Sequence, residues 1–247
     1  MYQFFVEPSL IGENTVIIKG SDVNHIKNVL RMKIGEELNV SNGIDGKEYR
    51  CAIKEYSDDE VICELRFVKE DNHELTSKIY LFQGLPKADK MESIIQKNVE
   101  LGVYEIIPVD MKRCVVKLDE KKSKNKVLRW QEIAKAAAKQ SKRGIIPQIN
   151  NVMSFKDAVN YANERCNICL IPYEMAEDMD YTRKIINNIN PGENIAVFIG
   201  PEGGIDQAEL DLAINTGFKK ITLGKRILRT ETAGMTVMSV LMYLLEQ

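Results

Sequence analysis

The sequence has no apolar run long enough to cross a membrane. The longest apolar stretch, Met235 to Leu245, contains Thr236 and Ser239 and is shorter than the roughly 20 residues that a transmembrane helix requires. The first residues, MYQFF, also lack the charged segment and long apolar core of a secretory signal. The sequence therefore predicts a cytoplasmic protein.

Cysteine and histidine are both scarce, with five and two copies among 247 residues. An odd number of cysteines without regular spacing does not indicate a disulfide framework. Cys166 and Cys169 form a single C-x-x-C pair, and both histidines, His25 and His73, are far from it in sequence. Zinc or redox chemistry is one reading, but the apolar neighbour Ile168 favours buried strand cysteines. We expect no metal site.

The sequence contains neither of the common phosphate-binding glycine motifs, G-x-x-x-x-G-K-[ST] and G-x-G-x-x-G. Internal repeats and low-complexity segments are absent as well. Hydrophobic residues make up 44% of the chain and charged residues 28%, which is ordinary for a globular protein. The length suffices for one large domain or two modest ones.

Charge is unevenly distributed along the chain. Residues 84–143 hold 15 basic and 8 acidic side chains, whereas residues 1–70 hold 9 and 13. Within the basic segment, Lys135, Lys139, Lys142 and Arg143 share the spacing of one helix face. An RNA backbone would relieve the repulsion among them, although solvent would do so too. The basic segment indicates a surface for a polyanion, but on charge alone we favour the alternative of a solvated lysine-rich face.

Two regions differ in the pattern of their expected elements. Residues 1–70 read as short strands around one helix that begins at Ser21, which predicts a small barrel. The expected strands cover residues 15–19, 37–41, 48–53 and 61–68. After the polar residues 70–74, strands and helices alternate, which is typical of a mainly parallel α/β sheet. We expect domains at 1–72 and 73–247, and in the second a charged connection at 117–126 before a helix that runs from about residue 126 to 141.

Two loops in the last fifth of the chain indicate a ligand site. One is Gly200–Gly204 after the apolar run 195–199, and the other is Leu223–Ala233 after residues 220–222. Glycines allow close approach to the main chain, and ligands in α/β sheets usually bind at the carboxyl ends of strands. Glu202 argues against a phosphate ligand because like charges repel. The loops suit an adenosine joined to a sulfonium amino acid.

The same two segments resemble a known family. IGPEGGIDQAEL (199–210) and LGKRILRTETAG (223–234) are similar to the two signature motifs of the ribosomal RNA small-subunit methyltransferase E family, in the SPOUT superfamily. Further similar blocks are HIKNVLR (25–31), QKNVELG (96–102) with EIIP (105–108), and RW (129–130) with AAAKQS (136–141) and Pro147. Lys139 departs from the family pattern, which more often has an acidic residue there.

The resemblance implies a fold and a function. The expected fold is α/β, with a SPOUT-type parallel sheet, a C-terminal trefoil knot and a small N-terminal PUA-like β-barrel that binds RNA. The family uses S-adenosyl-L-methionine to methylate N3 of a uridine in 16S ribosomal RNA, and its members are homodimers. The implied cofactor-binding residues lie on three loops: Ile171, Pro172, Glu174, Ile199, Gly200, Pro201, Glu202, Gly203, Gly204, Leu223, Gly224, Ile227, Leu228, Thr230, Thr232 and Ala233.

Neither histidine falls in a cofactor-loop motif, so the general base is not obvious. We expect Arg229 to stabilise the developing uracil anion and Glu231 to accept a proton, unless both only shape the loop. The expected contacts to the RNA backbone are basic residues from both regions: His25, Arg31, Lys87, Lys90, Arg113, Lys139, Lys142 and Arg143. Two alternatives are a SPOUT ribose 2′-O-methyltransferase and a non-catalytic ribosome-assembly factor. The intact glycine loops argue against the second.

Overall fold

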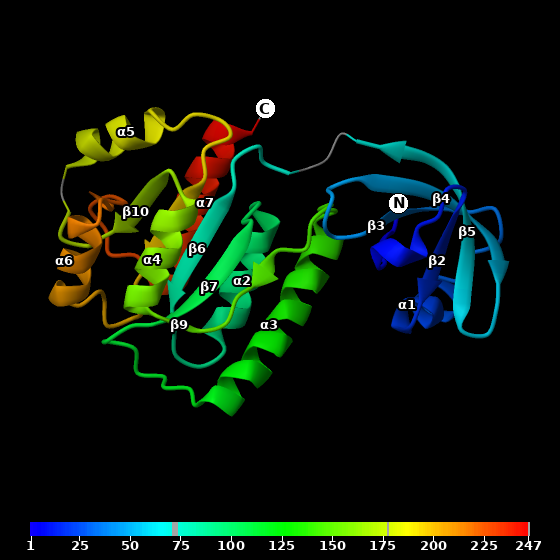
Figure 1. Ribbon diagram of the computed structural model, residues 1–247, viewed down its shortest axis with the longest axis horizontal. Helices are drawn as coiled ribbons and strands as arrows, with labels where there is room; N and C mark the ends of the chain where they lie inside the picture. The colour runs from blue at the N-terminus through cyan, green and yellow to red at the C-terminus, as the bar shows by residue number, and fades with distance from the viewer. Residues whose placement is uncertain (71–73, 177, 247) are drawn as a thin grey trace. The chain divides into compact units, whose positions relative to one another are not determined.

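The computed structural model describes residues 1–70, 74–176 and 178–246 (Figure 1). The chain forms two compact units, one of Met1–Glu74 with Ala138–Ile146 and the other of Leu75–Ala137 with Pro147–Gln247. The domain boundary expected at residues 72 and 73 lies outside the described residues, so the limits 1–72 and 73–247 stay a prediction.

The first unit is a five-stranded sheet with the strand order β1-β3-β4-β5-β2. Its strands are β1 (Gln3–Phe5), β2 (Thr15–Lys19), β3 (Glu37–Ser41), β4 (Glu48–Tyr56) and β5 (Glu60–Lys69). β1 pairs with β3 in parallel, and the other pairs are antiparallel. The four strands expected from the sequence are confirmed. β4 continues past the expected end to Tyr56, and its register against β5 shifts at two places.

The helical segment of the first unit combines a short α-helix with a π turn. After η1 (Pro8–Leu10), α1 (Ser21–Asn24) continues into a π turn, η2 (His25–Val29). Gly20, with φ of +72°, takes the N-cap position, and no side chain caps this helix. The expected helix start at Ser21 is confirmed, with Gly20 and not Ser21 as the N-cap. Val23 and Ile26 are buried in the core of this unit.

Residues 138–146 pack with the first unit although the sequence places them inside the second domain. Arg143 is 3% exposed, and its guanidinium donates to both carboxylate oxygens of Glu74. The Arg143 carbonyl accepts a hydrogen bond of 2.6 Å from Gln3 Nε2. Lys139 Nζ donates to Asp22 Oδ1 at 2.7 Å. These buried polar contacts tie the segment to the N-terminal sheet.

The second unit is a seven-stranded, entirely parallel sheet. The order is β12-β10-β11-β6-β7-β8, and β9 also pairs with β7. The strands are β6 (Ile79–Gly84), β7 (Glu105–Asp110), β8 (Gln148–Ile149), β9 (Met153–Ser154), β10 (Ile168–Pro172), β11 (Ile195–Ile199) and β12 (Lys219–Ile221). Every residue of the central strands β6 and β11 is buried, as expected for a sheet that helices cover on both faces.

The helices of the second unit are α2 (Lys90–Glu100), α3 (Glu120–Gln140), α4 (Phe155–Arg165), α5 (Met179–Asn187), α6 (Gln207–Asn215) and α7 (Thr230–Leu245). α2 packs on α7, and α4 packs on α6. Figure 1 shows α4 in front of the sheet and α7 behind it. At the centre of the core, Phe82 on β6 stacks on Phe198 on the neighbouring strand β11, with ring centroids 4.2 Å apart. Among the described residues, no helix is long and apolar enough to span a bilayer.

Two helix boundaries differ from expectation. α3 begins at Glu120 inside the expected charged connection, because the Asp119 carboxylate accepts from the main-chain N–H of Lys122 at 2.8 Å and so caps the helix. The helix ends at Gln140, so Lys142 and Arg143 do not lie on its surface as expected. α7 begins at Thr230 with Arg229 at the N-cap position.

Candidate functional site

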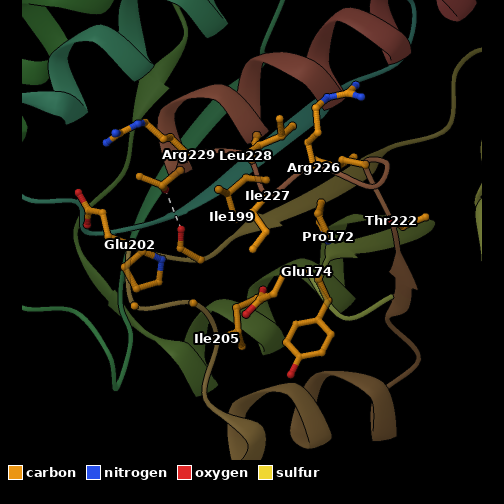
Figure 2. A pocket seen from close by; sticks show the side chains of 18 of the residues that line it. Pro172, Glu174, Ile199, Glu202, Ile205, Thr222, Arg226, Ile227, Leu228 and Arg229 are labelled. Atoms are coloured by element: carbon orange, nitrogen blue, oxygen red, sulfur yellow. Dashed lines mark hydrogen bonds between the residues drawn. The ribbon is translucent and has the colours of Figure 1, made fainter. Parts of the chain in front are cut away.

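A pocket of about 530 Å³ opens where β10, β11 and β12 end (Figure 2). Because these strands are parallel neighbours, their carboxyl ends meet at one edge of the sheet. The loops that follow them form the wall: Pro172–Glu174, Ile199–Ile205 and Thr222–Thr230, together with Lys90 and Ala233. The two loops singled out in the sequence are therefore opposite parts of one pocket.

The structure brings nearly all the expected cofactor residues together. All except Ile171 and Thr232 line the pocket; Ile171 is buried within β10, and Thr232 lies in the first turn of α7. Arg229 lines the pocket and Glu231 does not. The sequence prediction missed several lining residues, for which adjacency to the motifs was the only signal: Tyr173, Ile205, Thr222, Lys225 and Arg226.

Close packing explains the glycines of the first loop. A Cβ atom on Gly200 would lie 2.8 Å from Cγ1 of Ile205, which is closer than real contacts allow. Gly204 has a φ of +71°, a conformation that other residues resist. A Cβ on Gly204 would also lie 3.0 Å from Oε1 of Glu174. Side chains at these positions would therefore distort the loop.

A buried hydrogen-bond chain joins three parts of the pocket wall. Gln83, at the end of β6, is fully buried, and its Nε2 donates to Thr230 Oγ1 at 2.9 Å. The Thr230 hydroxyl donates in turn to the carbonyl of Gly200 at 2.7 Å. This chain links β6, the first glycine loop and the start of α7. The sequence prediction missed Gln83, whose only signal is an amide after the apolar residues of its strand.

Glu202 is not the free negative charge that the sequence suggested. Its carboxylate accepts from the main-chain N–H of Lys87 at 3.1 Å and lies 2.9 Å from Lys90 Nζ. Burial raises the pKa of Glu202, but the hydrogen bonds from Lys90 and from main-chain amides outweigh burial and hold the pKa below its ordinary value. The argument that Glu202 repels phosphate is therefore weakened, because Lys90 balances its charge.

Lys90 also faces Glu231, at 3.4 Å from Oε2. The hydrogen bond to Glu202 is the main cause that raises the pKa of Lys90, with a smaller contribution from Glu231. Glu231 Oε2 is buried and accepts no hydrogen bond. Lys90 thus lies between the first glycine loop and the N-terminal turn of α7.

The expected RNA contacts fall into two groups. The prediction that Arg143 contacts an RNA phosphate is wrong, because its buried guanidinium is bound to Glu74. Several others are engaged within the protein: Lys139 with Asp22, Lys90 with Glu202, and Arg113 with the carbonyl of Gly203 at 3.2 Å. The rest keep exposed or half-exposed side chains: His25, Arg31, Lys87 and Lys142.

The cysteines do not form a reactive centre. Burial raises the pKa of Cys166 to about 12 and that of Cys169 to about 11, so both thiols stay protonated near neutral pH. Over the residues that the structure describes, no group of histidine, cysteine, aspartate and glutamate side chains has an arrangement that would hold a metal ion.

Comparison with known proteins gives matches across nearly the whole chain. The RNA methyltransferase domain family matches residues 73–242, and the RNA methyltransferase PUA domain family matches residues 18–66. Ribosomal RNA small subunit methyltransferase E of Bacillus subtilis (strain 168) is 36% identical, over 98% of this chain and 96% of its own. The protein of the same name from Mesomycoplasma hyopneumoniae (strain 232) is also 36% identical, over 97% and 98%.

A solved structure has the same fold. The crystal structure of a ribosomal RNA small subunit methyltransferase E from Neisseria gonorrhoeae, bound to S-adenosyl methionine, is similar with a TM-score of 0.85 and 29% identity. The similarity covers 99% of this chain and 98% of that one. The sequence motifs, the parallel sheet with its looped pocket and these matches agree. The chain belongs to the ribosomal RNA small subunit methyltransferase E family.

Proposed function

We propose that this chain uses S-adenosyl-L-methionine to methylate N3 of one uridine in 16S ribosomal RNA. The observation that carries the proposal is the single pocket formed by both signature loops, Gly200–Gly204 and Leu223–Ala233. The motifs identify the reaction class, and the family relatives act on the small-subunit RNA according to their names.

The residues present fit the cofactor. A volume of about 530 Å³ lies in the usual range for small-molecule pockets. Ile199 and Leu228 provide apolar surface for a purine, and the glycine loops expose main-chain groups that can read its edge. The Gly200 carbonyl already accepts from Thr230, so other main-chain groups of these loops would make the contacts. When bound, the cofactor supplies an electrophilic methyl group.

Uracil N3 carries a proton and is a poor nucleophile, so the protein must position the base and favour loss of that proton. Arg229 is proposed to stabilise the developing anion. Its side chain makes no ion pair within the described part of the chain, and Figure 2 shows it at the pocket on the loop that precedes α7. Glu231 is proposed as the proton acceptor because it lies in the first turn of α7, two residues after Arg229.

RNA recognition is proposed to involve both units. Because N3 lies on the base-pairing edge, the target uridine has to be unpaired or extruded during the reaction. Lys87 and Lys142 have exposed side chains that are suited to phosphate contacts. The first unit, which matches a PUA domain family, is proposed to bind the RNA around the target.

Two further properties belong to this proposal. The C-terminal segment is proposed to thread the trefoil knot of the SPOUT fold, and the protein is proposed to act as a homodimer. α7 supports the second point, because Val240, Tyr243 and Leu244 on its surface are 40%, 82% and 43% exposed. Such an apolar face on a helix is typical of a surface that another protein covers.

The test is to map the methylated position in small-subunit RNA. RNA from cells that lack this protein should carry an unmethylated N3 at one uridine, and the purified chain with S-adenosyl-L-methionine should restore the methyl group there. Methylation at a ribose 2′-hydroxyl would instead support the alternative enzyme. Failure to bind the cofactor in calorimetry would support a non-catalytic assembly factor.

A further inference from the structure

The pocket wall carries carboxylates with different surroundings. Glu202 lies 2.9 Å from Lys90 Nζ, and the nearby Glu231 lies 3.4 Å from the same nitrogen. Glu174 also lines the pocket, but it forms no hydrogen bond or ion pair with any described residue. The Lys90 ammonium therefore lies near two carboxylates, Glu202 and Glu231, whereas no cation among the described residues pairs with Glu174.

The position of Glu174 follows from the fold. It lies two residues after the end of β10 at Pro172, and its Oε1 lies above Gly204, 3.0 Å from where a Cβ atom would be. Figure 2 shows the Glu174 side chain among the lining residues with its carboxylate directed into the pocket. Because Gly204 has no side chain, the carboxylate stays open to the space that a ligand would fill.

Arg113, which also lies near Gly204, is engaged with other groups. Arg113 Nη1 donates to the Gly203 carbonyl at 3.2 Å, and its Nε lies 3.7 Å from Asp206. No ion pair joins Arg113 to Glu174 within the 4.0 Å that defines one. Lys225 and Arg226 also line the pocket, and both have exposed side chains without an ion pair in the described part of the chain.

We propose that Glu174 makes the pocket prefer the positively charged methyl donor over the product that remains after transfer. The inference rests on the proposed function. The donor has a sulfonium that carries one positive charge, and S-adenosyl-L-homocysteine has a neutral thioether in its place. Transfer moves the methyl group to uracil N3, which loses its proton, and the sulfur keeps the electron pair of the broken bond. A carboxylate without a paired cation attracts the additional positive charge of the donor, which the product lacks, so the product leaves more easily.

The expected size of the preference follows from Coulomb's law. In surroundings that are partly solvent, the attraction between a carboxylate and a sulfonium in one pocket gives a preference of roughly three- to tenfold. Glu174 is exposed, so salt should weaken the preference.

The test compares the dissociation constants of three ligands for the full chain by calorimetry. They are S-adenosyl-L-methionine, S-adenosyl-L-homocysteine and sinefungin, which carries an ammonium group at the position of the sulfonium. We expect Glu174→Gln to weaken binding of both cationic ligands by about three- to tenfold and to leave the product affinity nearly unchanged. Glu164→Gln is the matched control, because it removes the same charge from an exposed side chain outside the pocket.

An equal effect of Glu174→Gln on all three ligands would overturn the proposal. If the variant does not fold, the same binding measurements on the wild-type protein test the proposal. Its preference for the cationic ligands should shrink between 50 mM and 500 mM salt. A preference that does not depend on salt would overturn the proposal. A wild-type chain that binds none of the three ligands would contradict the proposed function itself, and a chain that binds them without a charge preference would contradict only the role of Glu174.

Discussion

Lys90 is the cation on which the charge balance of the pocket entrance depends. It lies within 3.4 Å of one carboxylate on the first glycine loop, Glu202, and of another in the first turn of α7, Glu231. The sequence alone predicts this side chain as a contact to the RNA backbone. The structure shows that it instead balances the charge of the two carboxylates, Glu202 and Glu231.

Lys90→Met should change how stability depends on pH. The pKa of Glu202 in the folded protein lies below the ordinary value of 4.5, so its stabilisation is present above about pH 4.5 and is lost as the pH falls through the lowered pKa. Without Lys90, burial opposes ionisation of Glu202 and this acid-dependent loss becomes smaller. We expect a melting temperature about 2–4 °C lower at pH 7 and a flatter profile below pH 4.5.

Thermal unfolding between pH 3 and pH 7 measures this effect. Lys97→Met is the control, because Lys97 forms an exposed ion pair with Glu100 on the same helix. Identical pH profiles for Lys90→Met and the wild type would show that Lys90 does not control the charge of Glu202.

Arg229→Ala should lower turnover at saturating cofactor by about 10²-fold, because a preorganised charge next to the reacting base is lost. The affinity for the cofactor should change little. Single-turnover methyl transfer to the RNA measures the effect, and Arg226→Ala removes the same charge from the same loop for comparison. Unchanged turnover in Arg229→Ala would remove this residue from the chemistry.

At the scale of elements, Thr230 joins α7 to the first glycine loop. Its hydroxyl accepts from Gln83 and donates to Gly200, and the residue is buried. Thr230→Val keeps the shape but removes the acceptor of one Gln83 N–H and the donor to the Gly200 carbonyl, which costs about 1–3 kcal/mol, while the bond from Gln83 Nε2 to the Gly84 carbonyl remains. We expect lower unfolding free energy and weaker cofactor binding in Thr230→Val. Thr230→Ser keeps the hydroxyl and should restore most of both, and equal losses in the two variants would argue against the hydrogen-bond chain.

The end of α3 shows how an element-scale prediction can fail. Helical spacing alone places Lys135, Lys139, Lys142 and Arg143 on one face, but the helix ends at Gln140 and two of these cations bind acids of the N-terminal unit. Spacing cannot reveal this, because Asp22 and Glu74 lie far away in the sequence. A buried cation and a solvated one look the same in a pattern of basic residues.

At the scale of the whole molecule, binding of RNA should depend on salt. The logarithm of the affinity should fall linearly with the logarithm of salt concentration. Lys87→Ala should reduce the slope by about 1, because one phosphate contact is lost. Arg143→Met should leave the slope unchanged and destabilise the fold by about 3–5 kcal/mol, because it removes the cation of the Glu74 ion pair. A reduced slope in Arg143→Met would show that this side chain does reach the RNA.

The proposed homodimer is a second property of the whole molecule. Tyr243→Glu places a charge on the exposed face of α7 and should convert the protein to a monomer in sedimentation experiments. Tyr181→Glu makes the same change on α5, where the tyrosine is 46% exposed, and should leave the dimer intact. A wild-type protein that sediments as a monomer would contradict the dimer.

Much of the fold of this protein can be predicted from local patterns in its sequence. Alternating strands and helices after residue 75 predict the parallel sheet, the apolar runs become buried strands such as β11, and the glycine loops mark the pocket. These features depend on residues close together in the chain, or on motifs whose loops follow neighbouring strands. For that reason they can be predicted from the sequence.

Only the tertiary structure decided the partners of the charged and polar side chains. It paired Glu202 with Lys90, buried Arg143, joined Gln83 to Thr230 across 147 positions, and gave Glu174 no paired cation among the described residues. The energy of a charge or a buried amide depends on the few atoms within about 4 Å of it. Those atoms come from distant parts of the chain, so folding alone brings them together.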